Sequence, residues 1–268
     1  MLWEELTAKE FGEARDKSHG TCLVPIGVIE KHGDHLPLGT DMYMARKLAE
    51  DVARIEPVVV FPYYFFGQIA EARHCPGTIA IKPSLMYDLL EEICKEISRN
   101  GFKKIIILNG HGGNPSFLNY FIQSTLYKKN DYAVYCITGY LQPDDSSLDN
   151  KIKDIFGEDY FDYHAGSAET SEVLSVRPDL VKLEHADEAG FKAQHKLDHI
   201  TATHTFTAMN WYSDFPVHQA GDPTKACIEA GELLCAAKAE RVAKIVKIIK
   251  EDKVTRQLLD EFYSKVEK

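Results

Sequence analysis

The run Lys104–Asn109 most constrains the fold, because its interior, Ile105 to Leu108, is apolar at every position. A strand with one face in water alternates apolar and polar residues, whereas a strand covered on both faces is continuously apolar. The run Cys22–Ile29 has the same character, although Pro25 interrupts it. Both runs therefore predict central strands of a parallel sheet.

Helical patterns alternate with these strands, as apolar residues recur every third or fourth position. Helices are expected over Met42–Ala53, from Pro83 to the Asn100-Gly101 cap, from Pro115 with Asn114 as N-cap, over Gly166–Val176, over Thr224–Lys250 and at the end of the chain. Further strands are expected over Pro57–Phe61 and Tyr132–Thr138. The alternation predicts an α/β fold, a three-layer α/β/α sandwich with a mostly parallel central sheet.

Two regions do not fit this pattern. The stretch 141–163 is polar and is interpreted as irregular, as a flap or a subunit contact, and the stretch 181–223 gives no clear prediction. Because no linker, repeat or low-complexity tract interrupts the chain, residues 1–268 are expected to form one domain.

Composition narrows the functional classes. The 41 acidic side chains exceed the 31 basic ones, giving a net charge of −10, which argues weakly against nucleic acid as a partner. The six cysteines show no C-x-x-C spacing and are interpreted as reduced thiols of a cytoplasmic protein. No signal-like leader and no apolar run of ~18 residues is present, so no membrane partner is expected.

The first candidate site follows the strand at Cys22–Ile29. Glu30 and His32 are two residues apart, so in an extended chain both side chains point to the same face. A carboxylate with an imidazole suits zinc, manganese and similar divalent metals, although such a pair is also common in surface loops. Asp41, where the next helix is expected to begin, adds a third candidate ligand.

The second candidate is the loop Asn109-Gly-His111-Gly-Gly-Asn114, which follows the other central strand. Sites in parallel sheets form outside the carboxyl ends of the strands, so this loop and Glu30 are expected on one edge. A glycine-rich loop also binds phosphate, but neither usual phosphate-loop motif is present. His111 is thus a metal ligand or an ordinary loop histidine.

The third candidate is the stretch from Tyr163 to Ser171. Glu169 falls in the first turn of an expected helix, where a glutamate often only caps the backbone. His164, just upstream, has a side chain that can act as an acid or a base near neutral pH.

Taken together and in this order, the three blocks resemble the creatininase (creatinine amidohydrolase) family. Segments at Pro76–Ile79 and Pro178–Val181 resemble further family positions. The resemblance implies a layered α/β/α fold, a two-metal hydrolase and a homo-oligomer, with a hexamer favoured. By position it implies His164 as the catalytic histidine, one metal, manganese or another divalent ion such as Fe²⁺, on Glu30, Asp41 and His111, and Zn²⁺ on His32, Asp41 and Glu169, with Asp41 bridging.

The charges agree with this implied centre, since three carboxylates and two divalent ions leave a net charge of +1, which stabilises a hydroxide between the metals. The implied reaction is attack by this hydroxide on an amide-like carbonyl of a small molecule, a cyclic amide or formamide, with His164 moving the proton. Alternatives are ring opening of a keto-inositol (dehydro-inosose) at the same centre, and a small-molecule-binding protein without catalysis.

One position departs from the family pattern. Creatinine-cleaving members carry a carboxylate two residues after the metal-binding histidine of the second block, and a bulkier residue between, where this chain has Gly113 and Gly112. The tryptophans associated with creatinine binding also lack a counterpart, because Trp211 lies past the catalytic block. A substrate other than creatinine is therefore expected, and Arg73 or His74 are candidates for contacting it or for ordinary surface contacts.

Other readings are weaker. Cys75 follows His74, but adjacent residues are not expected to place a base on the thiol. The serine-hydrolase motif G-x-S-x-G is absent. His195 and His199 have the spacing of a helical metal site but lack its glutamate, and His35 is expected to pack in the loop or support a ligand.

Overall fold

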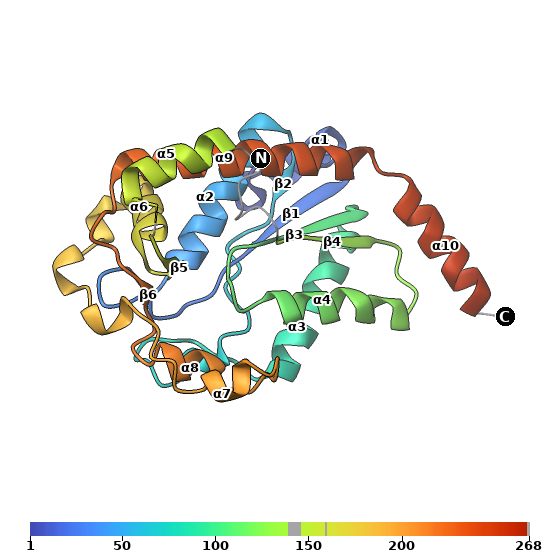
Figure 1. The fold of residues 1–268 in the computed structure, drawn as a ribbon. Coiled ribbons are helices and arrows are strands. Elements are labelled where there is room, and N and C mark those ends of the chain that lie inside the picture. The colour runs from blue at the N-terminus through green and yellow to red at the C-terminus, as the bar shows by residue number, and fades with distance from the viewer. Residues whose placement is uncertain (139–145, 159, 267–268) are drawn as a thin grey trace.

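The computed structural model describes residues 1–138, 146–158 and 160–266, and its core is a parallel four-stranded sheet (Figure 1). The strand order is β2-β1-β3-β4, with every neighbouring pair parallel. The strands are β1 (Thr21–Ile26), β2 (Val59–Val60), β3 (Lys104–Asn109) and β4 (Ala133–Ile137). In this register Ile26 of β1 lies beside Asn109 of β3, so both strands end at the same edge.

Two helical layers cover the sheet, which confirms the predicted fold class. Ile105 and Ile107 of β3 pack in one apolar cluster with α1 (Ala8–Lys17), α3 (Pro83–Arg99) and α4 (Pro115–Ser124). Ile106 and Leu108 pack on the other face with α2 (Thr40–Ile55) and α9 (Ile228–Glu251). Each face of β3 is therefore buried, as its continuous apolar run requires.

Additional elements lie beyond the carboxyl edge of the sheet. Strand β5 (Asp162–His164) pairs antiparallel with β6 (Ala220–Gly221), and α6 (Ser167–Val176) follows β5. Short helices build the stretch 181–223 and the remaining connections: η1 (Trp3–Glu5), η2 (Ala70–Ala72), η3 (Thr125–Tyr127), η5 (Pro178–Leu180), η6 (Leu183–His185), η7 (Glu188–Gly190), α7 (Asp198–Thr201) and α8 (Asn210–Asp214).

The interpretation of 141–163 as irregular is wrong for most of its length, since α5 spans Ser146–Phe156 and β5 begins at Asp162. Leu148, Ile152 and Phe156, four residues apart, form a buried stripe against α9. Residues 141–145 and 159 of that stretch lie outside the described residues.

Helices α6 and α9 pack closely beside the site. A Cβ added at Gly231 of α9 would lie 2.0 Å from the carbonyl oxygen of Ser171 in α6. Only glycine fits at this crossing, so α6 is held against α9 at backbone distance.

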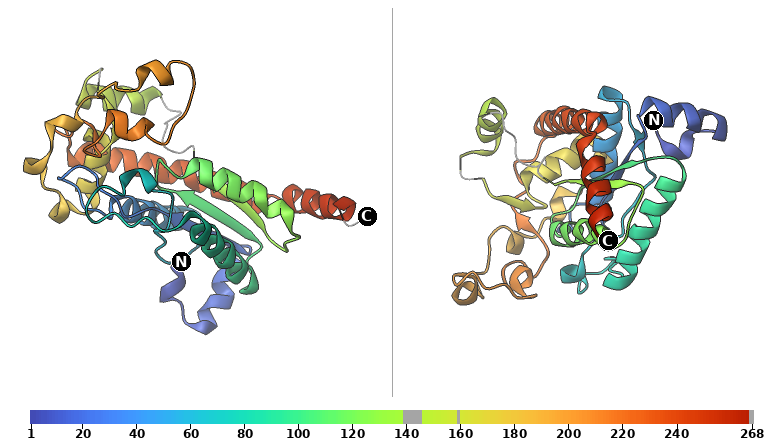
Figure 2. Two further views of the ribbon diagram at one scale, coloured as in Figure 1. Left: turned by 90° about the horizontal axis from the view of Figure 1, so that it is seen from below. Right: turned by 90° about the vertical axis from the view of Figure 1, so that its right-hand side faces the viewer.

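The chain ends in α10 (Val254–Val266), which extends away from the layered body (Figures 1 and 2). Tyr263 is the buried contact of α10, and its hydroxyl donates to the carbonyl oxygens of Thr125 or Lys128. Within the described residues, no helix has the length and apolar character needed to cross a membrane.

Candidate metal centre

Four of the predicted site residues lie at the carboxyl edge of the sheet. Glu30 and His32 follow β1, Asp41 is in the first turn of α2, and His111 follows β3. All four are at least nine-tenths buried. The parallel register brings the two loops together, as the sequence predicts.

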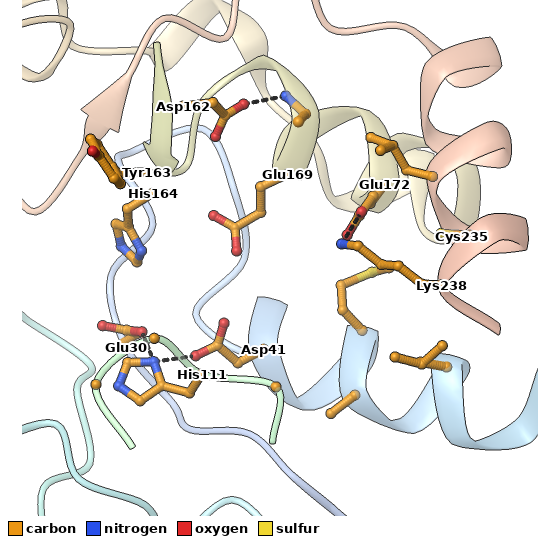
Figure 3. A pocket seen from close by; sticks show the side chains of 18 of the residues that line it. Glu30, Asp41, His111, Asp162, Tyr163, His164, Glu169, Glu172, Cys235 and Lys238 are labelled. Atoms are coloured by element: carbon orange, nitrogen blue, oxygen red, sulfur yellow. Dashed lines mark hydrogen bonds and ion pairs between the residues drawn. The ribbon is translucent and has the colours of Figure 1, made fainter. Parts of the chain in front are cut away.

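The first group consists of Glu30, Asp41 and His111. Nδ1 of His111 lies 2.8 Å from Oε1 of Glu30 and 2.8 Å from Oδ2 of Asp41 (Figure 3). Both carboxylate oxygens are buried and make no hydrogen bond. A buried oxygen without a partner costs about 1–3 kcal/mol, so these two oxygens, which converge with the His111 nitrogen, suit a cation.

The second group consists of His32, Asp41 and Glu169. Nε2 of His32 lies 3.1 Å from Oδ1 of Asp41 and 3.6 Å from Oε1 of Glu169. In each group one ligand atom per residue lies within 4.8 Å of the others. Asp41 thus turns Oδ2 toward the first group and Oδ1 toward the second, which is the arrangement a bridging carboxylate needs.

Glu169 reaches the edge from α6, about 140 residues downstream of Glu30. Its Oε2 accepts a 2.6 Å hydrogen bond from the backbone N–H of Ala165, so the expected cap-like role is also present. Its other oxygen, Oε1, stays directed at His32. The hydrogen bond to Ala165 therefore occupies Oε2 and leaves Oε1 for the second group.

Charges in the site favour a cation. Burial disfavours the imidazolium of His111, yet Glu30 and Asp41 raise its pKa well above the ordinary value. Burial also disfavours the imidazolium of His32, but Glu169 and Asp41 raise the pKa of His32 well above its ordinary value. Burial alone would raise the pKa of Glu169, but His32 lowers it to about 2. The carboxylates of Glu169 and Glu30, whose pKa values are both lowered, stay ionised and attract positive charge.

His164 lies against this centre and lines the cavity in front of it (Figure 3). Its ring is 4.2 Å from the ring of His32, and its Nε2 is 2.9 Å from the carbonyl oxygen of Lys31. Because a carbonyl only accepts, Nε2 carries the proton and Nδ1 keeps a free lone pair. Burial, followed by His32, lowers the pKa of His164, so the neutral base is favoured.

A cavity of ≈ 500 Å³ opens from the centre. Glu30, Asp41, His111 and Glu169 line one end, and the Glu172–Lys238 ion pair with Cys235 lines the other (Figure 3). This volume suits a small organic molecule.

Two residues of the site escaped sequence analysis. His218 places Nε2 2.6 Å from Oε2 of Glu30, and Trp211 donates its indole N–H to Nδ1 of His218 at 2.9 Å. Both also line the cavity, so Trp211, which lies past the catalytic block in the sequence, lies beside it in space. No motif marks them. The sole sequence signal is that His218 stands in the apolar stretch Phe215–Ala220.

Several other expectations change with the structure. Asn114 occupies the N-cap position of α4, but its side chain makes no cap, because it accepts from Gln68 N–H and donates to Asn109. Arg73 and His74 are exposed and do not line the cavity, whereas Glu71 does.

The expectation that His74 cannot reach the thiol of the adjacent Cys75 is wrong, because the Cys75 sulfur lies 3.4 Å from Nε2 of His74. That nitrogen donates to the carbonyl oxygen of Pro216 at 2.9 Å, so it offers the thiol no lone pair. Burial also raises the pKa of the Cys75 thiol. A cysteine hydrolase is not supported here.

The other candidate histidines, His35, His195 and His199, do not form a common site. Nε2 of His35 bonds the hydroxyl of Thr170 at 3.1 Å, a packing role beside Glu169. His195 and His199 do not share one helix, because α7 begins at Asp198. His195 instead meets Asp198 and Asp214 at the surface.

The comparisons agree with this geometry. The family model described as "Creatininase: Creatinine amidohydrolase" matches residues 4–246. The creatinine amidohydrolase of Pseudomonas putida is 25% identical over 256 residues, covering 90% of this chain and 91% of the relative.

Two further relatives carry other names. The mycofactocin precursor peptide peptidase of Mycolicibacterium smegmatis is 32% identical over 164 residues, 59% of this chain and 58% of the relative. The 3-dehydro-scyllo-inosose hydrolase of Thermotoga maritima is 31% identical over 120 residues, 42% of this chain and 36% of the relative.

Solved structures show the same fold. A crystal structure of creatinine amidohydrolase (creatininase) superposes with a TM-score of 0.74 at 22% identity, covering 94% of this chain and 98% of that one. With the family match over nearly the whole length, these findings confirm the resemblance drawn from the three blocks. The chain therefore belongs to the creatininase family of metal-dependent hydrolases.

Proposed function

We propose that this chain is a two-metal hydrolase of a small amide-like substrate. Glu30, Asp41 and His111 would hold one divalent ion, and His32, Asp41 and Glu169 the other, with Asp41 shared. Zn²⁺ and Mn²⁺, or Fe²⁺, suit these mixed nitrogen and oxygen donors. Structures titled as Zn-Zn and Mn forms of creatininase support this choice.

The observation that carries the proposal is the division of Asp41 between the groups. Its two oxygens face different imidazoles, at 2.8 Å and 3.1 Å. The buried oxygens Glu30 Oε1 and Asp41 Oδ2 make no hydrogen bond, so a role as plain internal polar contacts leaves them unsatisfied.

Two bound divalent ions would supply an activated water and polarise the substrate carbonyl. The protein's own residues then manage the proton. His164 keeps Nε2–H on the Lys31 carbonyl, so Nδ1 is the nitrogen that takes a proton from water and returns it to the leaving nitrogen. The burial of His164 keeps this nitrogen away from bulk water.

Creatinine is not the substrate we propose. A Cβ at Gly113 would lie 2.5 Å from Nε2 of His111 and 2.8 Å from Oε1 of Glu71. A carboxylate at this position would therefore require the side chains of His111 and Glu71 to shift. The space in front of Gly112 is open, since nothing lies within 4 Å of an added Cβ.

A cyclic amide or a formamide is therefore the favoured substrate, and the inosose hydrolase relative keeps a cyclic ketone as the second candidate. The test is a hydrolysis screen of cyclic amides, formamides and cyclic ketones with zinc- and manganese-loaded protein. Turnover of one class that requires Asp41 would support the proposal. Metal-loaded protein that binds members of these classes without turnover would instead indicate a binding protein.

We also propose self-association, with a hexamer favoured by the resemblance. Helix α10 carries an exposed apolar stripe at four-residue spacing, made by Val254, Leu258, Phe262 and Val266. Light scattering with size-exclusion chromatography tests the assembly, and a monomer at micromolar concentration would contradict it.

A further inference from the structure

The two oxygens of Glu30 are used differently. Oε1 lies in the first metal group, 2.8 Å from Nδ1 of His111, and has no hydrogen bond. Oε2 faces the opposite way and meets Nε2 of His218 at 2.6 Å. Glu30 is fully buried in the fold, and its Oε1 is the oxygen that belongs to the first metal group.

The indole of Trp211 fixes which nitrogen of His218 carries the proton. Its Nε1–H lies 2.9 Å from Nδ1 of His218, and an indole N–H only donates. Nδ1 must therefore be the acceptor, and the proton of the neutral ring sits on Nε2. The chain of hydrogen bonds runs in one direction, from Trp211 through His218 to Glu30.

The backbone holds His218 in place. Its φ is +55°, a left-handed conformation in which histidine is commoner than most other non-glycine residues. Its carbonyl oxygen accepts the N–H of Gly33 at 3.1 Å, and its N–H donates to Phe215 at 3.0 Å. The ring is 4.9 Å from that of His164 and is 1% exposed in total.

We propose that Trp211 and His218 are positioning residues for Glu30. They occupy Oε2 and leave only Oε1 for the ion of the first group, so that Glu30 acts as a ligand through one oxygen. This inference rests on the proposed two-metal function. It also makes the two metal positions unequal, because no contact of this pair reaches His32 or Glu169 among the described interactions.

Side-chain length allows the two hydrogen bonds to be separated. In His218→Asn the amide lies at the level of Nδ1, so it accepts from Trp211 but stops short of Glu30, and asparagine tolerates the positive φ. In His218→Gln the amide lies at the level of Nε2 and donates to Glu30. Trp211→Phe keeps the aromatic ring and removes the N–H, and Trp3→Phe is its matched control, since Trp3 packs among Phe11, Phe61 and Phe102.

The measurement is Zn²⁺ binding to the full chain by competition with a chromophoric chelator, with thermal unfolding in excess chelator as the test of folding. His218→Asn should weaken one of two binding steps by about 10–100-fold and leave the other unchanged. His218→Gln should restore most of the loss. Trp211→Phe should weaken the same step by a smaller factor, and Trp3→Phe should change neither.

The outcomes separate the two proposals. If wild-type protein binds two ions and His218→Asn binds both as tightly, the positioning role is wrong and the proposed function stands. Equal weakening of both steps, or no recovery in His218→Gln, would also overturn it in favour of general packing. Wild-type protein that binds no Zn²⁺ would remove the proposed function and this inference together.

Discussion

The carboxyl edge of the sheet and the stretch 181–223 build the site in different ways. At the edge, Asp41 lies in the first turn of α2, and Glu30 and His111 lie in the loops that follow β1 and β3. The 181–223 stretch has short helices and the two-residue strand β6, and it contributes Trp211 and His218 through single side chains. The ends of the central strands and α2 thus position these proposed ligands, and the irregular stretch supplies the hydrogen bonds proposed to orient one of them.

If this division is right, a substitution at the carboxyl edge of the sheet should have the largest effect on metal content and hydrolysis. Asp41→Ala should lose both ions and all hydrolysis, because it removes the one carboxylate shared by the two groups. Metal analysis after dialysis and a turnover assay measure the change. Glu50→Ala is the matched control, since Glu50 lies on the same helix but pairs with Arg46 and is not among the residues that line the cavity. Full metal content in Asp41→Ala would show that it does not bridge.

The second-largest effect is expected at the boundary between the two regions, where β5 pairs with β6. His164→Ala should keep both ions, while the chemical step slows by about 10²–10⁴-fold, the usual scale for lost acid–base catalysis. Single-turnover kinetics with metal-loaded protein measure it. The exposed His199 provides the control, and His199→Ala should match wild type. An unchanged rate in His164→Ala would remove His164 from the mechanism.

A smaller effect concerns stability at the same boundary. Burial raises the pKa of Asp162 in β5 to about 7, above its ordinary value of 3.8. The folded state then holds this proton more tightly than the unfolded state, so stability falls as pH rises from about 4 to about 7. Asp162→Asn keeps an acceptor for the Ala168 N–H.

Urea unfolding in excess chelator, at pH 5 and pH 8, measures this dependence. Asp162→Asn should gain on the order of 2 kcal/mol over wild type at pH 8 and much less at pH 5. A gain that is the same at both pH values would show that the charge on Asp162 is not its source.

The smallest effect is expected within the 181–223 stretch itself. The exposed group of His195, Asp198 and Asp214 contacts neither metal group in the described residues. His195→Ala should therefore change metal content and turnover by less than about twofold, as surface substitutions usually do. A loss of one ion in this variant would place a ligand outside the carboxyl edge and would break the comparison.

Sequence patterns predicted the regular half well, for physical reasons. A run such as Ile105 to Leu108 must be buried on both faces, and the parallel sheet then places Glu30 beside His111 without further information. Helix α5 was missed, although Leu148, Ile152 and Phe156 recur at the four-residue spacing of an amphipathic helix, because the polar residues of the surrounding stretch 141–163 were given more weight.

Tertiary contacts explain the other failures. Asn114 lies at the predicted N-cap, but its side chain forms hydrogen bonds with Gln68 and Asn109 instead of capping the helix. Local sequence patterns do not reveal such tertiary hydrogen bonds. Trp211 is linked to the site by one hydrogen bond and His218 by two, and no motif in the sequence marks either residue. Their role depends on the fold as a whole.

The crossing at Gly231 gives the second metal group an unexpected dependence. Glu169 is the proposed ligand carried by α6, and the Ser171 carbonyl oxygen of that helix lies where a side chain on α9 would begin. A single methyl at position 231 would force the two helices apart and move Glu169 with α6. The geometry of the proposed second metal group therefore depends partly on Gly231, a residue that belongs to neither group.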